Sequence, residues 1–400
     1  MELASDHDVI VVGAGILGLA SAYYILRNSP SSKVLVIERL GGVGRGSTAK
    51  SAAAFRDMFT SPPNRRLAEG AIAFYEEVEE RKARIGFRRI GYLWLMTADQ
   101  LRGNREALEY LSSVGVVYET MDPNELKRHL PGFEMEDVSK GILGSRCGIL
   151  NQNQLCQYYE QEIQRLGGKL LLNEEVDTLA ASSGHDVIGV KVGGKDILGD
   201  HVVVATGAWL GEMKGIDGLK GLVAPRKRQL FSIRTRSDEH KRLLNAKGFN
   251  SHSLLPFTIL PEGVYMRPAA NSFIIGYSDE DRATGIEEDA KAEPAFFEEM
   301  IRPQLVRYFP SFRDRRPDHS WAGYYAYHLP DKTPFITSIG GVIVVGGTSG
   351  SGVMKADSIG RAVAGSISGK KEVELGDGRF FRIADIGLDG REVPIEEFVI

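Results

Sequence analysis

The sequence predicts an α/β dinucleotide-binding domain joined to a second, α+β domain with a mainly antiparallel sheet. Residues 8–12 form an apolar run that leads directly into three glycines and then into a helical pattern. A second apolar run, residues 33–37, ends at an acidic residue about 20 positions after the glycines, as in dinucleotide-binding βαβ units. Residues 225–277 contain alternating runs separated by turn signals, which is typical of neighbouring antiparallel strands.

The three glycines have different roles in a dinucleotide-binding turn. Gly13 allows the tight turn, Gly15 lets the backbone approach a pyrophosphate, and Gly18 lets the helix pack against the strand. The helix that follows directs its free N–H groups and the positive end of its dipole at the phosphates. Glu38 can accept hydrogen bonds from a ribose, and its charge would repel a 2′-phosphate. An ordinary α/β turn explains the glycines alone, but not the ordered strand, helix, strand and acid.

Composition excludes several other classes of protein. The 400 residues contain 42% hydrophobic residues, enough for two domains with separate cores. The net charge is −4 and the charges are interspersed, so no basic stripe for nucleic acid is present. The two cysteines, Cys147 and Cys156, are too few for a disulfide framework and have no metal-ligand spacing. No apolar run reaches the roughly 20 residues of a membrane span. We therefore expect a cytoplasmic protein without a metal, and contact with the inner face of the membrane stays open.

The remaining elements follow from hydrophobic periodicity and from turn residues. Helices are expected at residues 65–84, 98–114, 124–129, 153–166 and 294–309. A last helix is expected after the glycine-rich stretch 350–354 and ends near residue 368. Strands are expected at residues 86–96, 141–149, 169–172, 186–192, 195–198, 201–209, 229–233, 263–268, 272–277, 320–327 and 342–345. This order predicts that the chain enters the second domain twice. The nucleotide-binding domain would comprise residues 1–85, 146–222 and 330–370, the substrate domain residues 86–145 and 223–329, and residues 371–400 a charged tail.

The ordered motifs resemble the FAD-dependent amine oxidoreductases of the D-amino-acid oxidase (DAO), glycine oxidase and sarcosine oxidase type, nearest to dye-linked L-proline dehydrogenase. The resemblance covers residues 7–370. It rests on the glycine turn with Glu38, the small-residue stretch 46–56, the strand end 205–209, the segment 321–331 and the glycine-rich stretch 350–354. It implies an α/β FAD-binding Rossmann-like domain plus an α+β substrate domain.

The resemblance also implies which residues bind FAD. Small residues after Gly46 would pass close to the pyrophosphate and the flavin, and the backbone of Val176 would hold the adenine. The last helix would begin at the glycine-rich stretch 350–354 and point its positive end at the flavin ring. The implied cofactor-binding residues are Gly13, Ala14, Gly15, Ile16, Leu17, Gly18, Glu38, Arg39, Ser47, Thr48, Lys50, Ser51, Ala52, Ala53, Val176, Ala205, Thr206, Gly207, Trp209, Gly350, Ser351, Gly352, Val353 and Met354.

The chain also departs from its sarcosine-oxidizing relatives. Sarcosine oxidases attach their flavin through a cysteine near the segment 321–331, where this chain has Tyr324, Tyr325 and Tyr327, so we expect FAD to be non-covalent. Family histidines fall on Ser278 and Arg228, and the family lysine falls on Met354. These differences argue against sarcosine oxidase itself.

Oxidation of an amine on a flavin requires a clamp for the substrate carboxylate, and a planar guanidinium is the best one. The candidates are Arg228 and Arg56, with Arg267 less favoured. Tyr265, Tyr325 and His328 could line the pocket, although core packing explains each of them equally well. An amine that binds already neutral needs no catalytic base, so His328 is not assigned as one.

The resulting hypothesis is an FAD-dependent amino-acid dehydrogenase or oxidase that acts on a small amino acid or secondary amine, such as L-proline or an N-methylglycine. Two alternatives stay open: a 2-hydroxy-acid or glycerol-phosphate dehydrogenase, and a non-catalytic flavoprotein subunit of an electron-transfer complex. The sequence does not identify the electron acceptor, which could be oxygen, a quinone or a dye. It also leaves homo-oligomerisation open.

Overall fold

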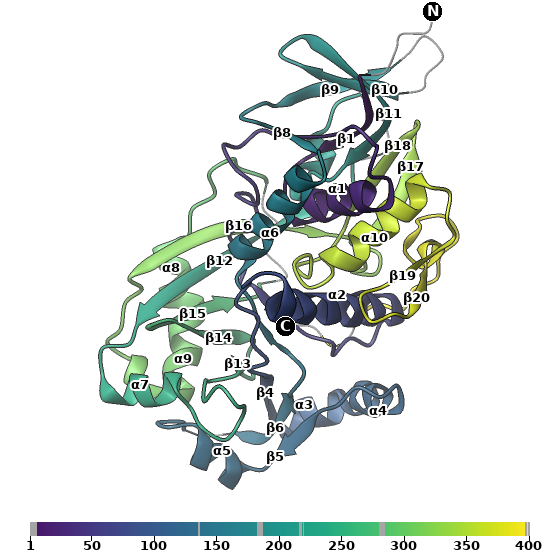
Figure 1. The fold of residues 1–400 in the computed structure, drawn as a ribbon. Helices are drawn as coiled ribbons and strands as arrows, with labels where there is room; N and C mark the ends of the chain where they lie inside the picture. Colours follow the sequence, from purple (N-terminus) through teal and green to yellow (C-terminus); the bar gives the residue numbers. More distant parts are fainter. Residues whose placement is uncertain are drawn as a thin grey trace, which may run out of the picture.

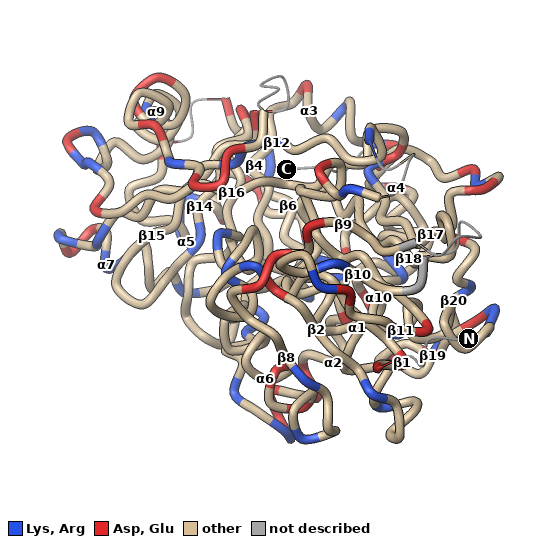
Figure 2. Tube along the Cα trace, turned by 90° about the horizontal axis from the view of Figure 1, so that it is seen from above, with Lys and Arg blue, Asp and Glu red and all other residues tan. Residues whose placement is uncertain are grey.

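The computed structural model describes residues 6–134, 137–181, 187–215, 218, 220–279, 285–396 and 398. Two large sheets lie in different parts of the molecule, and helix α2 (Pro62–Arg81) lies between them (Figure 1). Basic and acidic residues are interspersed over the molecule in the view of Figure 2.

The first sheet has a parallel centre, in which β18, β11, β1, β2 and β8 are hydrogen-bonded in that order. β17 pairs antiparallel with β18 at one edge, and β10 joins β11 to β9. The strands are β1 (His7–Val12), β2 (Val34–Glu38), β8 (Lys169–Leu172), β9 (Val176–Ala181), β10 (Val187–Val192), β11 (Lys195–Val204), β17 (Phe335–Ile339) and β18 (Val342–Gly346). β1 is buried over its last four residues, as expected for the centre of a parallel sheet.

Three helices cover one face of this sheet (Figure 1): α1 (Ile16–Asn28), α6 (Gln152–Arg165) and α10 (Ala356–Ile367). Residues 16–26 of α1 are all buried, because α1 packs between the sheet and its two neighbours. The predicted strand–helix–strand unit with Glu38 at its end is therefore present.

The second sheet is mixed, with the order β16-β12-β15-β14-β13-β4-β6-β5. β13 pairs parallel with β4, whereas the other neighbouring strands pair antiparallel. The parallel pair forms where the two separate excursions of the chain meet, and it makes the sheet mixed, which the expectation of a mainly antiparallel sheet did not include. The strands are β4 (Tyr92–Thr97), β5 (Glu119–Met121), β6 (Val138–Gly144), β12 (Ala224–Arg234), β13 (Phe257–Ile259), β14 (Val264–Ala269), β15 (Ser272–Tyr277) and β16 (His319–Tyr327).

Helices around the second sheet are more broken than the periodicity predicts. The expected helix 98–114 is divided into two at Asn104, and the expected helix 294–309 contains a π-helical turn. Pro303 follows that turn, and a proline has no N–H to continue the regular helical pattern. The elements are α3 (Ala98–Gly103), α4 (Arg105–Ser113), α5 (Pro123–His129), α7 (Asp238–Leu244), α8 (Pro294–Phe296), η2 (Phe297–Ile301), α9 (Arg302–Tyr308) and η3 (Pro310–Phe312).

Two further expectations need correction, those for the strands near residue 200 and for the start of α10. The two expected strands 195–198 and 201–209 are one strand, β11, which ends at Val204 and is followed by the 3-10 helix η1 (Gly207–Glu212). The expected strand 186–192 corresponds to β10, and residue 186 lies outside the described residues. α10 begins at Ala356, so the glycine-rich stretch 350–354 forms the turns that precede it.

Residues after α10 pack back onto α10 and contact β17 at the edge of the first sheet. They form β19 (Glu372–Glu374), β20 (Phe380–Arg382) and the 3-10 helix η4 (Ile383–Ile386), and two short strands elsewhere, β3 (Ala54–Phe55) and β7 (Gly148–Ile149), pair with each other. The chain then returns to the region between the two sheets, beside α2 (Figure 1). No described helix is long and apolar enough to pass through a membrane.

Candidate active site

A cavity of about 230 Å³ lies at the carboxyl ends of β1, β2 and β11. Its wall includes Val12 at the end of β1, Glu38 at the end of β2 and Ala205 just after β11. This is the edge of a parallel sheet at which dinucleotides bind in doubly wound folds.

The turn after β1 can be formed only by glycine. Gly13 has a φ of +101°, and a Cβ on it would lie 2.8 Å from the carbonyl oxygen of Ala205. A Cβ on Gly18 would lie 1.9 Å from the carbonyl oxygen of Gly13, so α1 packs directly on the turn. At Gly15 the nearest atom to such a Cβ would be the Thr48 hydroxyl at 3.8 Å, and Gly15 lines the cavity. The backbone at Gly15 is therefore open to a ligand.

Glu38 is fixed by the backbone around the same turn. Its carboxylate accepts hydrogen bonds from the Ala14 N–H at 2.8 Å and from the Leu40 N–H at 2.9 Å. One of these bonds falls on each oxygen, so each oxygen retains a lone pair for another donor. Because Glu38 also lines the cavity, it can accept hydrogen bonds from ribose hydroxyls.

Two buried hydroxyls in the cavity wall test independently whether the cavity suits a dinucleotide. Ser47 Oγ and Thr206 Oγ1 are buried, and neither has a hydrogen-bond partner within the described part of the chain. Buried polar groups are normally satisfied, so both are explained by a polar ligand in the cavity. Thr48 Oγ1 accepts from the Ile16 N–H at 3.2 Å at the start of α1. These donors, together with the helix N-terminus, suit phosphate oxygens.

Most of the residues expected to bind FAD line this cavity. They are Gly13, Gly15, Ile16, Leu17, Glu38, Arg39, Ser47, Thr48, Ser51, Val176, Ala205, Thr206, Gly207, Trp209, Gly350, Gly352 and Val353. Ala52, Ala53, Ser351 and Met354 line the neighbouring cavity instead. Ala14, Gly18 and Lys50 line neither cavity: Ala14 and Gly18 support the turn, and Lys50 packs against Gly323. The first cavity is also lined by residues that the sequence analysis did not indicate: Glu174, Glu175, Glu212, Met213 and Thr348.

A second cavity, of about 100 Å³, adjoins the first. Ser51, Tyr325, Gly350 and Val353 line both, so the two cavities meet at these residues. Of the proposed substrate residues, Arg228, Arg56, Tyr265 and Tyr325 line the second cavity. Burial raises the pKa of both tyrosines, so both phenols stay neutral at pH 7.

Arg228 has the chemistry of an anion clamp. The guanidinium is buried and donates to the carbonyl oxygens of Asp279 at 2.8 Å and Lys227 at 3.2 Å. It lies over the Tyr325 ring, with Cζ 5.0 Å from the ring centroid. Its Nε is buried and has no hydrogen-bond partner among the described residues. A buried guanidinium that contacts only carbonyls and rings favours an anionic ligand.

Arg56 also lines the second cavity. Burial lowers the pKa of its guanidinium, and the charge of Glu396 opposes that shift. The Arg56 side chain donates to the Met58 carbonyl oxygen and stacks 4.0 Å from the centroid of the Phe59 ring. Arg267 does not line the cavity: it donates to the Pro268 carbonyl oxygen, and burial lowers its pKa to about 10.

His328 lines neither cavity. The ring is buried, its Nδ1 lies 2.8 Å from Asp331 Oδ1, and the Arg391 side chain lies 3.0 Å from the same nitrogen. The structure therefore places His328 in an ionic cluster behind the cavity and not among the residues that would face a substrate.

Sequence reasoning missed a buried amine in the second cavity, that of Lys355. Its Nζ donates to Asn64 Oδ1 and to Ser351 Oγ, both at 2.6 Å. Burial lowers the pKa of this amine well below 10.5. The available signal was a lysine within the otherwise small and apolar start of the last helix. Asn64, Tyr92 and Glu396 were also missed, because they lie far from the motifs in the sequence.

A buried carboxylate holds the start of α10 against the rest of the core. Asp357 accepts from the Tyr24 hydroxyl at 2.5 Å and from Arg361 Nε at 2.9 Å. The Tyr75 hydroxyl donates to the Val353 carbonyl oxygen at 2.8 Å. These contacts position the end of α10 that faces the junction of the two cavities.

Comparison with known proteins agrees with this site. The family model described as FAD dependent oxidoreductase (DAO) matches residues 8–365. The chain is 26% identical to FAD-dependent oxidoreductase domain-containing protein 1 of Bos taurus, over 89% of this chain and 80% of the relative. It is 24% identical to glycine oxidase of Pseudomonas aeruginosa, over 91% and 96% of the two chains. The solved structure of L-proline dehydrogenase from P. horikoshii superimposes with a TM-score of 0.76 at 23% identity, covering 92% of this chain and 95% of that one.

A protein with a dinucleotide cavity that opens onto a small cationic cavity has the architecture of a flavin-dependent oxidoreductase. The chain belongs to the DAO family of FAD-dependent oxidoreductases, and its cofactor is FAD.

Proposed function

We propose that this enzyme oxidises the C–N bond of a small amino acid or secondary amine, of the class of glycine, sarcosine or L-proline. One observation carries the proposal: the dinucleotide cavity meets a second cavity that contains a buried arginine with no carboxylate partner among the described residues. The names of the glycine oxidase relative and of the L-proline dehydrogenase structure support the same substrate class.

The protein's main task in this reaction is positioning. FAD supplies the acceptor for the hydride that leaves the substrate carbon. Arg228 would bind the substrate carboxylate, and the walls formed by Tyr265 and Tyr325 would fix the direction of the substrate chain. The small residues Ser51 and Gly350 leave room for close approach where the cavities meet.

The chain's own groups also favour a neutral amine. The Arg56 guanidinium places positive charge in the second cavity, which disfavours a protonated substrate amine beside it. No catalytic base is needed for an amine that binds neutral.

Non-covalent attachment of FAD is part of the proposal. Cys147 and Cys156 are both buried, and neither lines the first cavity. Burial raises the pKa of both thiols, which keeps them protonated and unreactive. Denaturation with acid should therefore release all of the FAD into the supernatant.

The function is tested by mixing the FAD-loaded protein anaerobically with a panel of small amino acids, N-methylated amino acids, 2-hydroxy acids and glycerol phosphate. The proposal expects loss of the flavin absorption band with at least one amine. Bleaching by hydroxy acids or glycerol phosphate alone would favour the alternative dehydrogenase activity, and a flavin that no compound reduces would contradict both.

A further inference from the structure

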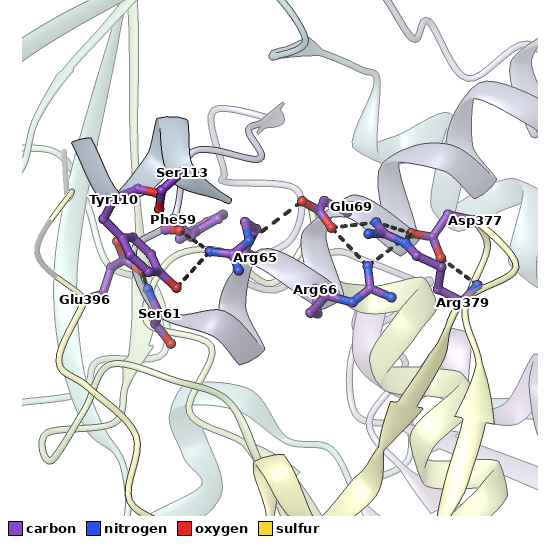
Figure 3. Close-up of polar contacts among 10 residues, drawn as sticks. All are labelled: Phe59, Ser61, Arg65, Arg66, Glu69, Tyr110, Ser113, Asp377, Arg379 and Glu396. Carbon is purple, nitrogen blue, oxygen red and sulfur yellow. Dashed lines mark hydrogen bonds and ion pairs between the residues drawn. The ribbon is translucent and has the colours of Figure 1, made fainter. Parts of the chain in front are cut away.

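The segment after Gly390 forms part of the second cavity, although it lies beyond the residues that match the family model. Its residue Glu396 is 3% exposed and lines that cavity. Figure 3 shows Glu396 beside Ser61, at the start of α2 and on the opposite side of Arg65 from the ionic cluster of Glu69 and Asp377.

The Glu396 carboxylate accepts hydrogen bonds from backbone N–H groups and from one hydroxyl. Oε1 accepts from the Thr60 N–H at 2.9 Å and from the Thr60 hydroxyl at 3.0 Å, and Oε2 accepts from the Ser61 N–H at 3.0 Å. Ser61 is the N-cap residue of α2, and its own side chain makes no capping hydrogen bond. Glu396 therefore satisfies donors at this helix end, where a negative charge is favourable.

The segment is anchored on both sides of Glu396. The Arg391 side chain bonds to Asp331 at 3.0 Å and to the Pro334 carbonyl oxygen at 2.9 Å, next to β17. Phe398 is buried, with its ring centroid 4.8 Å from that of Trp94 on β4. The described residues of the segment thus contact Pro334, next to β17 of the first sheet, and β4 of the second, and Glu396 lines the cavity between these contacts.

Glu396 also determines the charge balance of the cavity. Among the described residues, its lining includes four basic side chains, Arg56, Arg228, Lys332 and Lys355, and one acidic side chain, Glu396. Glu396 is the main negative charge acting on both Arg56 and Lys355. In contrast, no carboxylate of the described residues forms an ion pair with Arg228. Glu396 thus supplies a counter-charge for Arg56 and Lys355, whereas none of the described carboxylates pairs with Arg228.

We propose that Glu396 is a specificity-determining residue that limits the second cavity to substrates with one carboxylate. The substrate carboxylate binds at Arg228, and Glu396 repels a second carboxylate from the part of the cavity that Arg56 and Lys355 line. This inference rests on the proposed function, because it takes the second cavity as the substrate site. It refines the substrate class to monocarboxylate amines and excludes dicarboxylate amines.

The test measures binding of two unreactive acids of equal carbon number, propionate and malonate, to the FAD-loaded full chain. Each acid is titrated, and binding is followed by the change in the flavin absorption spectrum and by the shift in melting temperature. Wild type should bind propionate at least as tightly as malonate. In E396Q the ratio of the malonate to the propionate dissociation constant should fall about tenfold, because the dianion gains more from removal of one nearby negative charge.

Glu392→Gln is the matched control, because Glu392 is exposed on the same segment and lines neither cavity. That variant should keep the wild-type ratio. If the ratio of the malonate to the propionate dissociation constant in E396Q stayed within threefold of the wild-type ratio, the proposed role of Glu396 would be wrong. Tighter binding of malonate than of propionate by wild type would also contradict it. The wild-type preference tests the proposal even if E396Q does not fold. If neither acid perturbs the flavin or the melting temperature, the substrate site itself is misplaced and the proposed function fails with the inference.

Discussion

At the residue scale, the decisive side chain is Arg228, a buried guanidinium whose Nε has no partner among the described residues. The sequence singled it out, since a planar cation on a strand near the flavin suits a carboxylate. It could not separate Arg228 from Arg56, because the feature that distinguishes them is the position of Glu396, which is 168 residues further along the chain than Arg228.

Arg228→Ala should raise KM for the amino-acid substrate about 30- to 100-fold, because a charge-assisted contact with a carboxylate contributes roughly 2–3 kcal/mol. FAD content should stay at the wild-type level, since Arg228 does not line the first cavity. Steady-state kinetics and the flavin-to-protein absorbance ratio measure the two effects. Arg234→Ala, at the exposed end of the same strand, is the control and should change neither. An unchanged KM in Arg228→Ala would remove this residue from the site.

Lys355 leads to a prediction about pH. The pKa of the Lys355 amine is lower in the folded protein than in the unfolded chain, where it has its ordinary value of 10.5. Between these two pKa values, the unfolded chain binds more protons than the folded protein. Stability therefore rises with pH through this window. The melting temperature of wild type should rise relative to that of Lys355→Met between pH 7 and pH 10, as measured by thermal unfolding in parallel buffers. A difference independent of pH would mean that Lys355 has the same pKa in both states.

At the scale of elements, the glycine turn after β1 was the most predictable part of the site, because its chemistry is local. Strand, turn, helix and acid follow one another within residues 7–38, and the structure has each of them. The helices around the second sheet were less predictable. Pro303 interrupts one of them, and β13 pairs parallel with β4, a contact between segments about 160 residues apart that periodicity does not encode.

The turn before α10 allows a test of whether Gly350 and Tyr325 shape both cavities, since both residues line each of them. Gly350 has a φ of +89°, and a Cβ on it would lie 2.3 Å from a Tyr325 ring carbon. Gly350→Ala should therefore displace Tyr325 and weaken both FAD and substrate binding, which titration with FAD and steady-state kinetics would measure. Gly340→Ala is the matched control, because Gly340 also has a positive φ of +57° but has no atom within 4 Å of the added Cβ. The control should lose only about 1 kcal/mol of stability. Equal FAD affinity in the two variants would contradict the claim that Gly350 and Tyr325 shape the FAD cavity where it meets the second cavity.

At the scale of the whole molecule, the candidate active site is assembled from segments that are distant in the sequence. The small-residue loop after β2, strands β12 and β16, the turn before α10 and the segment ending at Phe398 all contribute to the second cavity. The resemblance predicted the first three contributions. The last could not be predicted, because nothing in a charged segment of about 30 residues indicates that one glutamate will cap a helix more than 300 residues earlier.

The central claim is that the flavin end of FAD reaches the junction of the two cavities while Arg228 holds the substrate carboxylate. A crystal structure of the FAD-loaded protein with bound propionate tests it most directly. The account predicts the flavin ring beside Ser51, Tyr325, Gly350 and Val353, and the propionate carboxylate within hydrogen-bond distance of Arg228. A flavin ring away from that junction, or a carboxylate bound at Arg56 with Arg228 still lacking an anionic partner, would contradict it.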